Sequence, residues 1–276
     1  MKINSPDFYN ALKDYNFDIK NNSGYFWKQD YIFTDFINKL YEIRLQYPKT
    51  NPMNLIAKLL MNSSFGRFGM KPINTTQAFL TKEEFLKISE NYDVTDWIDL
   101  GANGVFVTFV DPNKDTTNNS AVHIASAVTS YARVLISKFK NNPSYKLYYS
   151  DTDSIFIDKP LDPLFVGKEL GQFKLEYIFK DVVFLAPKIY AGVTTEGNYI
   201  CKIKGYKNAK NIAFEDMKSL LKNNANLELS HNKWFRSLDK SNIQVRKELY
   251  NLMVTQNKRD IVYSNNSAVN TKALKL

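Results

Sequence analysis

The 276-residue sequence predicts an α+β fold, in which helices lie against a mostly antiparallel sheet. Two observations carry this prediction. Apolar residues recur at helical spacing in three segments, 30–46, 52–65 and 121–139. Short runs of aromatic and β-branched residues bounded by polar turns indicate strands, most clearly in 104–110 and on both sides of the acidic stretch in 146–158.

The first two helices are predicted to form an antiparallel hairpin. In 30–46 the apolar positions of one face are Phe33, Phe36, Ile37, Leu40 and Ile43. Pro48 ends this helix. Asn51 and Pro52 are typical of an N-cap followed by proline in the first turn, so a second helix begins there and runs to about Phe65.

The rest of the chain alternates between sheet and helix. Segment 70–118 is mixed, with one strand at 104–110, and Ser120 can cap the helix at 121–139. A hairpin follows, and then further strands, predicted at 173–179, 181–186 and 188–194. The tail from about residue 206 is polar, asparagine-rich and basic, and we expect it to be helical.

Composition narrows the possible functions. The net charge of +9 is spread along the chain, which favours a polyanionic partner such as nucleic acid, although a solvated lysine-rich surface is the plainer explanation. One cysteine, Cys201, and two histidines exclude an intrachain disulfide and a zinc cluster. A catalytic metal would therefore have oxygen ligands, which points to Mg²⁺ or Mn²⁺.

No apolar run is long enough for a membrane span, and the first residues lack the features of a targeting leader. We therefore expect the protein to work in the compartment where it is made. The heavy use of Asn, Lys, Ile, Phe and Tyr suggests AT-rich coding DNA, as in organelles, many phages and some bacteria.

The stretch YYSDTDSIF (148–156) places two carboxylates, Asp151 and Asp153, at a turn between apolar strands. Such neighbours repel unless a cation lies beside them. The plain explanation is a turn in which Asp caps its own backbone. A calcium loop is excluded because Ile155 and Phe156 occupy positions that need an oxygen ligand and a glycine. The chemistry that fits is metal-assisted phosphoryl transfer, in which carboxylates at a tight turn hold paired divalent ions.

The second constellation lies on the helix that begins at Pro52. At 100° per residue Lys58, Asn62 and Phe65 share one face, opposite Ile56 and Leu59. An ammonium, an amide and a ring in one stripe suit a nucleotide. A solvent-facing stripe with a chance aromatic before a glycine C-cap explains the same residues and stays open.

Together these two stretches resemble family B DNA polymerases. KLLMNSSFG (58–66) is similar to the K-x-x-x-N-S-x-Y-G signature, with Phe65 at the tyrosine position, and YSDTDS (149–154) matches the Y-x-D-T-D-S signature. KIY (188–190) resembles the K-x-Y element that grips the primer end, and KIKG (202–205) a step toward the thumb. The approach in 24–44 resembles protein-primed enzymes of fungal mitochondrial linear plasmids.

The resemblance implies a role for each matching residue. Asp153 is the principal metal-ligating carboxylate, and Asp151 adds charge and some metal contact. The residues implied in binding the incoming nucleotide are Lys58, Asn62, Phe65 and, by position alone, Arg44. Those implied in holding primer or DNA are Lys188, Tyr190, Lys204 and Gly205. Phe65 lacks the hydroxyl of the family's tyrosine, so any polar contact of that hydroxyl is absent.

The resemblance also implies part of a polymerase right hand. It divides the chain into a lead-in segment (1–29), fingers helices (30–70), a palm (71–205) and a thumb-like, helical basic region (206–276). The implied partners are a DNA template-primer, a dNTP, and a terminal protein primer or a separately encoded N-terminal part. The implied cofactor is Mg²⁺ or Mn²⁺, and the implied location is the mitochondrion.

Two elements of the family are not found here. The D-x-x-S-L-Y-P motif supplies the other metal-binding aspartate, and neither Asp7, Asp14 nor Asp18 begins one. The proofreading exonuclease is absent as well. A two-metal centre that lacks a ligand loses orders of magnitude in rate, so we expect poor primer extension by this polypeptide alone. The alternatives are a catalytically dead nucleic-acid-binding remnant and, less well supported, a structural protein that leaves the acidic turn unexplained.

Overall fold

The computed structural model describes residues 3–14, 18, 20, 23–70, 75–111, 120–237, 242–256 and 259–274. The chain forms two compact units, Met1–Asn142 and Pro143–Leu276. The α+β class is confirmed, since both units contain helices and every strand pair is antiparallel except one isolated bridge. No helix of the described residues is long and apolar enough to cross a membrane.

The predicted helical hairpin is confirmed as α2 (Thr34–Gln46) and α3 (Pro52–Phe68). Asn51 is the N-cap of α3, where its side-chain oxygen accepts the backbone N–H of Met53 at 2.9 Å. The amide of Asn54 joins the two helices, because its nitrogen donates to the carbonyls of Arg44 and Tyr47, both at 2.8 Å.

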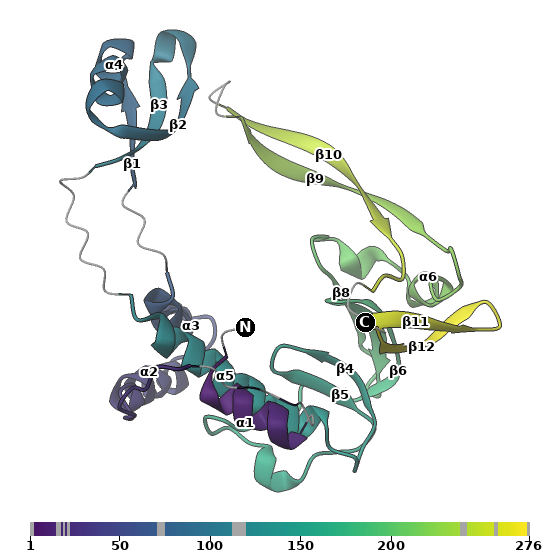
Figure 1. Cartoon of the computed structure of the whole chain (residues 1–276). Helices are drawn as coiled ribbons and strands as arrows, with labels where there is room; N and C mark the ends of the chain where they lie inside the picture. The colour runs from purple at the N-terminus through teal and green to yellow at the C-terminus, as the bar shows by residue number, and fades with distance from the viewer. Residues whose placement is uncertain are drawn as a thin grey trace. The chain divides into compact units, whose positions relative to one another are not determined.

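The third predicted helix is confirmed as α5 (Val122–Lys140), and α1 (Ser5–Asp14) lies beside it (Figure 1). The sequence did not predict α1. It is fixed on α5 by an ion pair between Asp7 and Arg133, and the pKa of Asp7 is lowered chiefly by the hydrogen bond from that guanidinium. Asp7 therefore has a structural partner.

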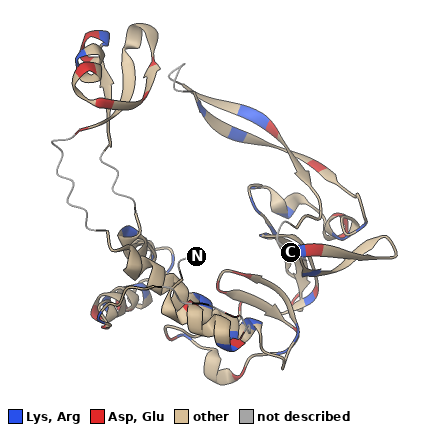
Figure 2. Cartoon of the chain, in the orientation of Figure 1, with Lys and Arg blue, Asp and Glu red and all other residues tan. Residues whose placement is uncertain are grey.

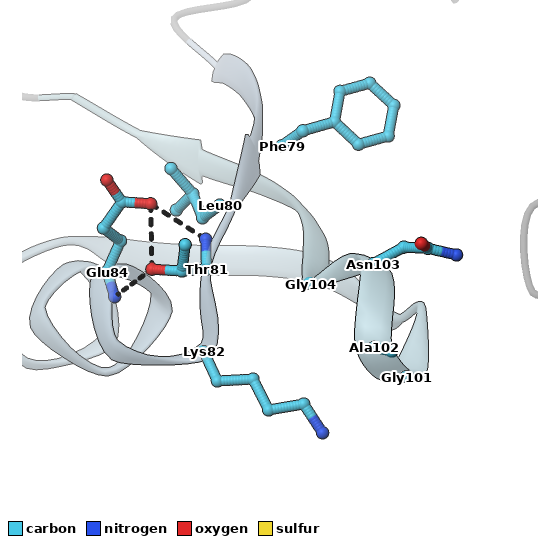
Figure 3. A pocket seen from close by; sticks show the side chains of 9 residues that line it. All are labelled: Phe79, Leu80, Thr81, Lys82, Glu84, Gly101, Ala102, Asn103 and Gly104. Atoms are coloured by element: carbon cyan, nitrogen blue, oxygen red, sulfur yellow. Dashed lines mark hydrogen bonds between the residues drawn. The ribbon is translucent and has the colours of Figure 1, made fainter.

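A small sheet and α4 (Lys82–Asn91) fill the mixed segment of the first unit. The strands are β1 (Thr75–Leu80), β2 (Asp93–Asp99) and β3 (Val105–Val110), in the order β1-β3-β2, and β3 confirms the predicted strand at 104–110. A capping box between Thr81 and Glu84 starts α4 beside an open pocket (Figure 3). Gly104 closes that turn with φ +93°, and a Cβ there would collide with the carbonyl oxygen of Leu80. None of the predicted site residues lines this pocket.

The second unit begins with two antiparallel sheets. The predicted hairpin is confirmed as β4 (Leu147–Asp151) and β5 (Ser154–Ile157). A three-stranded sheet follows in the order β6-β7-β8, from β6 (Phe179–Ala186), β7 (Ile189–Thr194) and β8 (Tyr199–Ile203). The core beside this sheet includes Leu185 of β6 and Met217 of α6 (Phe214–Ser219), and both side chains are fully buried.

Two predictions for the second unit are wrong. Residues 174–178 are not a strand, and of 173–179 only Phe179 enters β6. The predicted helical region 206–276 is mainly two β-hairpins, β9 (Leu227–Ser237) with β10 (Asn242–Leu252), and β11 (Arg259–Ser264) with β12 (Ser267–Ala273).

Local chemistry explains the hairpins in the tail. Asn and Ser are weak helix formers, whereas the strands contain Trp, Phe, Ile, Val and Tyr, which suit a pleated surface. Asn265 and Asn266, with φ of 48° and 60°, form a two-residue turn of the kind that joins twisted strands.

Candidate functional site

The two predicted metal ligands lie at the turn between β4 and β5. Asp151 ends β4 opposite Ser154 of β5, so Thr152 and Asp153 form the turn. Thr152 has φ +53°, and its hydroxyl donates to Oδ1 of Asp151 at 3.1 Å. The hydroxyl of Ser154 donates to the carbonyl of Asp151 at 3.0 Å. The turn is therefore tight and hydrogen-bonded, and it is confined to Thr152 and Asp153, because Ser150 and Asp151 belong to β4.

The carboxylate of Asp151 is occupied by a cation of the chain itself. Nζ of Lys188 lies 2.6 Å from both carboxylate oxygens. The pKa of Lys188 is raised, first because this hydrogen bond favours the charged ammonium. The two side chains are 53% and 34% exposed, for Lys188 and Asp151 respectively, so solvent weakens the pair without preventing it.

Asp153 is placed differently. It is exposed, and among the described residues no hydrogen bond or ion pair involves its carboxylate. The turn thus presents one carboxylate already paired with a cation and one that is open to solvent.

The backbone of Lys188 is fixed on both sides. It lies in the two-residue turn between β6 and β7 with φ +63°. Its N–H donates to the hydroxyl of Tyr149 at 2.7 Å, and its carbonyl accepts the N–H of Lys204 at 3.1 Å. Tyr149 and Asp151 are two residues apart on β4, so their side chains leave the same face of the strand and both reach Lys188.

An aromatic cluster supports the acidic turn. The rings of Tyr149 and Phe184 stack with centroids 4.9 Å apart, and Phe156 meets Tyr190 edge-on at 5.2 Å. These contacts join the β4–β5 hairpin to the β6–β7 strands. The pKa of Tyr190 is raised, mainly by burial, and the charge of Asp151 adds to that shift.

The remaining predicted DNA-binding residues are part of the same hydrogen-bonded patch. The carbonyl of Lys204 accepts the hydroxyl of Tyr250 at 2.9 Å, and Gly205 has φ +81° at the turn that follows β8. The second unit therefore brings Lys188, Tyr190 and Lys204 next to the acidic turn. The alternation of residues along the strands does not predict these tertiary contacts.

The other predicted residues belong to the first unit. On α3, Lys58 and Asn62 are exposed and Phe65 is half-buried. The less exposed face of α3 is a different one, with Ala57 buried and Asn54, Met61, Ser64 and Phe68 half-buried. Arg44 is half-buried in the last turn of α2. Their roles in nucleotide binding stay predictions.

Sequence reasoning missed the structural part of Tyr149. Tyr149 is part of the YSDTDS stretch, but only the structure shows that its hydroxyl accepts the N–H of Lys188 and so fixes the turn between β6 and β7. The available signal was its i, i+2 relation to Asp151 on a strand. Tyr250 carried no such signal, because it lies 46 positions from Lys204 and in a segment expected to be helical.

The residues fit a divalent cation in their chemistry. Carboxylate oxygens are the ligands that Mg²⁺ and Mn²⁺ prefer, and the Lys188 ammonium stands where a cation is attracted to Asp151. Within the part of the chain that the structure describes, no group of three or more His, Cys, Asp or Glu could hold a metal. The acidic turn would therefore supply two carboxylate ligands, those of Asp151 and Asp153, to a divalent cation.

Comparison with known proteins gives a consistent picture. Residues 4–147, more than half of the chain, match the model of the organellar and viral DNA polymerases of type B. A "Probable DNA polymerase" of Ascobolus immersus is 35% identical over 272 residues, which are 96% of this chain and 22% of that protein. A protein of the same name from Neurospora intermedia is 33% identical over 252 residues, 88% of this chain and 25% of its own length.

A more distant relative, the "DNA polymerase" of the Acidianus bottle-shaped virus, is 28% identical over 153 residues, 55% of this chain and 16% of that protein. The chain spans about a quarter of the length of the fungal relatives it matches. No solved structure matches the chain.

Proposed function

The chain belongs to the organellar and viral DNA polymerases of type B, and we propose that it carries the nucleotidyl-transfer site of a DNA-templated DNA polymerase. The observation that carries this proposal is the tight Asp151–Asp153 turn, fixed by an aromatic cluster next to Lys188, Tyr190 and Lys204. It combines carboxylates for metal with basic and aromatic residues for a nucleic acid backbone.

The proposed division of labour follows the chemistry of each side chain. Asp153, which is open, and Asp151 would hold Mg²⁺ or Mn²⁺. When bound, paired divalent ions stabilise the attacking and leaving oxygens of phosphoryl transfer. Lys188 and Tyr190 hold the primer strand, and the Lys204–Gly205 step contacts the DNA that follows.

The first unit would supply the nucleotide contacts. The ammonium of Lys58, exposed on α3, binds the triphosphate, and the half-buried ring of Phe65 lies beside the base pair with Asn62. Arg44 is a second phosphate ligand in this proposal. In the terms of a polymerase right hand, α2 and α3 are the fingers and β4–β8 belong to the palm.

We assign the thumb role to the tail hairpins. Lys233, Arg236, Arg246 and Lys247 lie on β9 and β10, where Figure 2 shows basic residues along both strands. Lys233 and Arg246 lie over the ring of Phe235, at 5.7 and 5.6 Å from its centroid. A basic hairpin with rings and guanidinium groups suits a DNA backbone.

The same proposal includes further polymerase polypeptide. The chain spans 22% to 25% of the two fungal relatives above, and the segment before α2 exposes large rings, with Tyr25 86%, Phe26 97% and Tyr31 91% exposed. Exposed apolar surface of this kind is typical of a face that other protein covers. That polypeptide would supply the missing aspartate motif, and a terminal protein would supply the primer.

We propose a mitochondrial location. It is supported by the fungal origin of the relatives and by the residue usage, which suggests AT-rich coding DNA.

Two measurements on the purified chain test the function. The first is dNTP binding. We expect it to need Mg²⁺ and to weaken about tenfold in Lys58→Ala, since an ion pair with phosphate is lost. Lys39 is exposed on α2, so Lys39→Ala is the matched control and should bind dNTP as the unaltered chain does. DNA binding that ignores both dNTP and Lys58→Ala would instead favour the non-catalytic remnant.

The second measurement is primer extension with Mg²⁺ and template. We expect low incorporation by the chain alone and a loss of about 100-fold or more in Asp153→Asn. Glu83→Gln, at an exposed carboxylate on α4, is the control because it changes the net charge by the same amount as Asp153→Asn. Robust incorporation that survives Asp153→Asn would refute the assignment of the site.

A further inference from the structure

The backbone of Lys188 is hydrogen-bonded on both sides, whereas its side chain is half-exposed. Its N–H is bound by Tyr149 and its carbonyl by Lys204, at 2.7 and 3.1 Å. The side chain is 53% exposed, and among the described residues its ion pair is the contact of 2.6 Å with Asp151. The ammonium can therefore exchange partners while the turn that carries it stays in place.

The ammonium and a divalent cation compete for the same oxygens. Lys188 uses both carboxylate oxygens of Asp151, so a cation bound there would lie against a like charge. The conflict ends if the ammonium moves to another anion. A primer-strand phosphate is such an anion, and it binds lysine as a point charge.

We infer that Lys188 restrains divalent-cation binding at the acidic turn until a primer phosphate draws its ammonium away from Asp151, so that cation binding and DNA binding are coupled. The DNA half of this inference rests on the proposed function. The cation half concerns only Lys188 and the carboxylates. Lys188 is in this respect a positioning residue, because it acts through Asp151.

The cation half is tested by titrating the full chain with Mn²⁺ and measuring free Mn²⁺ by electron paramagnetic resonance, without DNA. Lys188→Met should bind Mn²⁺ about two- to fivefold more tightly than the unaltered chain, the range that a half-exposed ion pair allows. Lys188→Arg should bind as the unaltered chain does, because it keeps the charge.

Lys180→Met is the matched control. Lys180 is exposed on β6 of the same sheet, at the end away from the Lys188 turn, and the substitution removes the same charge. It should leave Mn²⁺ affinity unchanged. Equal tightening in Lys188→Met and Lys180→Met would reduce the effect to net charge and overturn the inference, as would no tightening in Lys188→Met.

The DNA half is tested by the reciprocal measurement. Anisotropy of a labelled primer–template duplex gives its Kd with and without Mn²⁺ at constant ionic strength. Linkage requires Mn²⁺ to favour DNA binding in the unaltered chain and in Lys180→Met, relative to Lys188→Met. The same Mn²⁺ response in all three proteins would overturn the coupling.

Asp153→Asn separates this inference from the proposed function. If it abolishes Mn²⁺ binding while Lys188→Met changes nothing, the site stands and the restraint by Lys188 is refuted. If Asp153→Asn leaves Mn²⁺ binding intact, or if the unaltered chain binds none, the site assignment fails and the inference fails with it. Circular dichroism of each variant checks that the fold is kept.

Discussion

The acidic turn and the lysine-bearing helix α3 carry the two halves of the proposed chemistry, and they rest on very different support. The sheet beneath the turn buries Leu185 and Ala191 completely and joins an extensive hydrophobic core. Helix α3 buries only Ala57, while Leu55 and Leu59 are 55% and 56% exposed.

This difference fits the demands of each task. Carboxylates that hold metal ions need positions fixed to a fraction of an ångström, which a packed sheet provides. A helix that binds a nucleotide can take its final position from other protein or from the ligand. We therefore expect α3 to be less stable locally than β6–β8, because few apolar contacts hold it.

The largest expected effect comes from the core under the turn. Leu185→Ala should lower the free energy of unfolding of the second unit by about 3 kcal/mol, because it leaves a cavity at a fully buried site. Urea unfolding followed by circular dichroism measures this. Leu164→Ala, at a 74% exposed position of the same unit, is the control and should change little. A similarly small loss of unfolding free energy in both variants would contradict the view that a well-packed core supports the acidic turn.

Hydrogen exchange sharpens the comparison directly. Backbone amides of α3 should exchange at least about tenfold faster than those of β6–β8, which corresponds to about 1.4 kcal/mol in opening free energy. Mass spectrometry of peptides from 52–68 and 179–203 reads both in one sample. If α3 were protected as strongly as the sheet, the exposure of Leu55 and Leu59 would not indicate that the helix is less stable locally.

The sequence predicted those parts of the fold whose signals are local. The three helices and the β4–β5 hairpin were correct, because caps such as Asn51 and the alternation around Asp151 are written in adjacent residues. The tail was wrong, since its polar composition hid strands that are held by pairing 11 residues of β9 with β10. Helix α1 was missed because its stabilising partner, Arg133, lies 126 positions away.

The candidate site shows the same limit. The motif located Asp151, Asp153 and Lys188 but not the contact between Asp151 and Lys188, which are 37 positions apart. That contact depends on the packing of Tyr149 against Phe184, a tertiary arrangement that residue spacing does not determine.

A smaller effect is expected where α1 meets α5. Asp7→Asn should destabilise the first unit by about 0.5–1 kcal/mol near neutral pH, because it removes a forked ion pair whose arginine is 58% exposed. Since the folded pKa of Asp7 is lowered, its stabilisation is complete above the ordinary value of 3.8 and is lost as pH falls through the folded value. The difference between Asp7→Asn and the unaltered chain should therefore vanish in acid. A difference that persists there would show that charge is not its cause.

The smallest effect is expected on the exposed side of α3. Leu59→Ala should change the free energy of unfolding by less than about 0.5 kcal/mol, since the side chain is already 56% exposed and alanine favours helix. Leu40→Ala on α2, where leucine is 8% exposed, is the matched comparison and should cost about 2 kcal/mol or more. Thermal unfolding of both variants gives the contrast. A large loss for Leu59→Ala would mean that this face is packed against protein in the isolated chain. Weak packing of α3 would then no longer distinguish it from the sheet beneath the acidic turn.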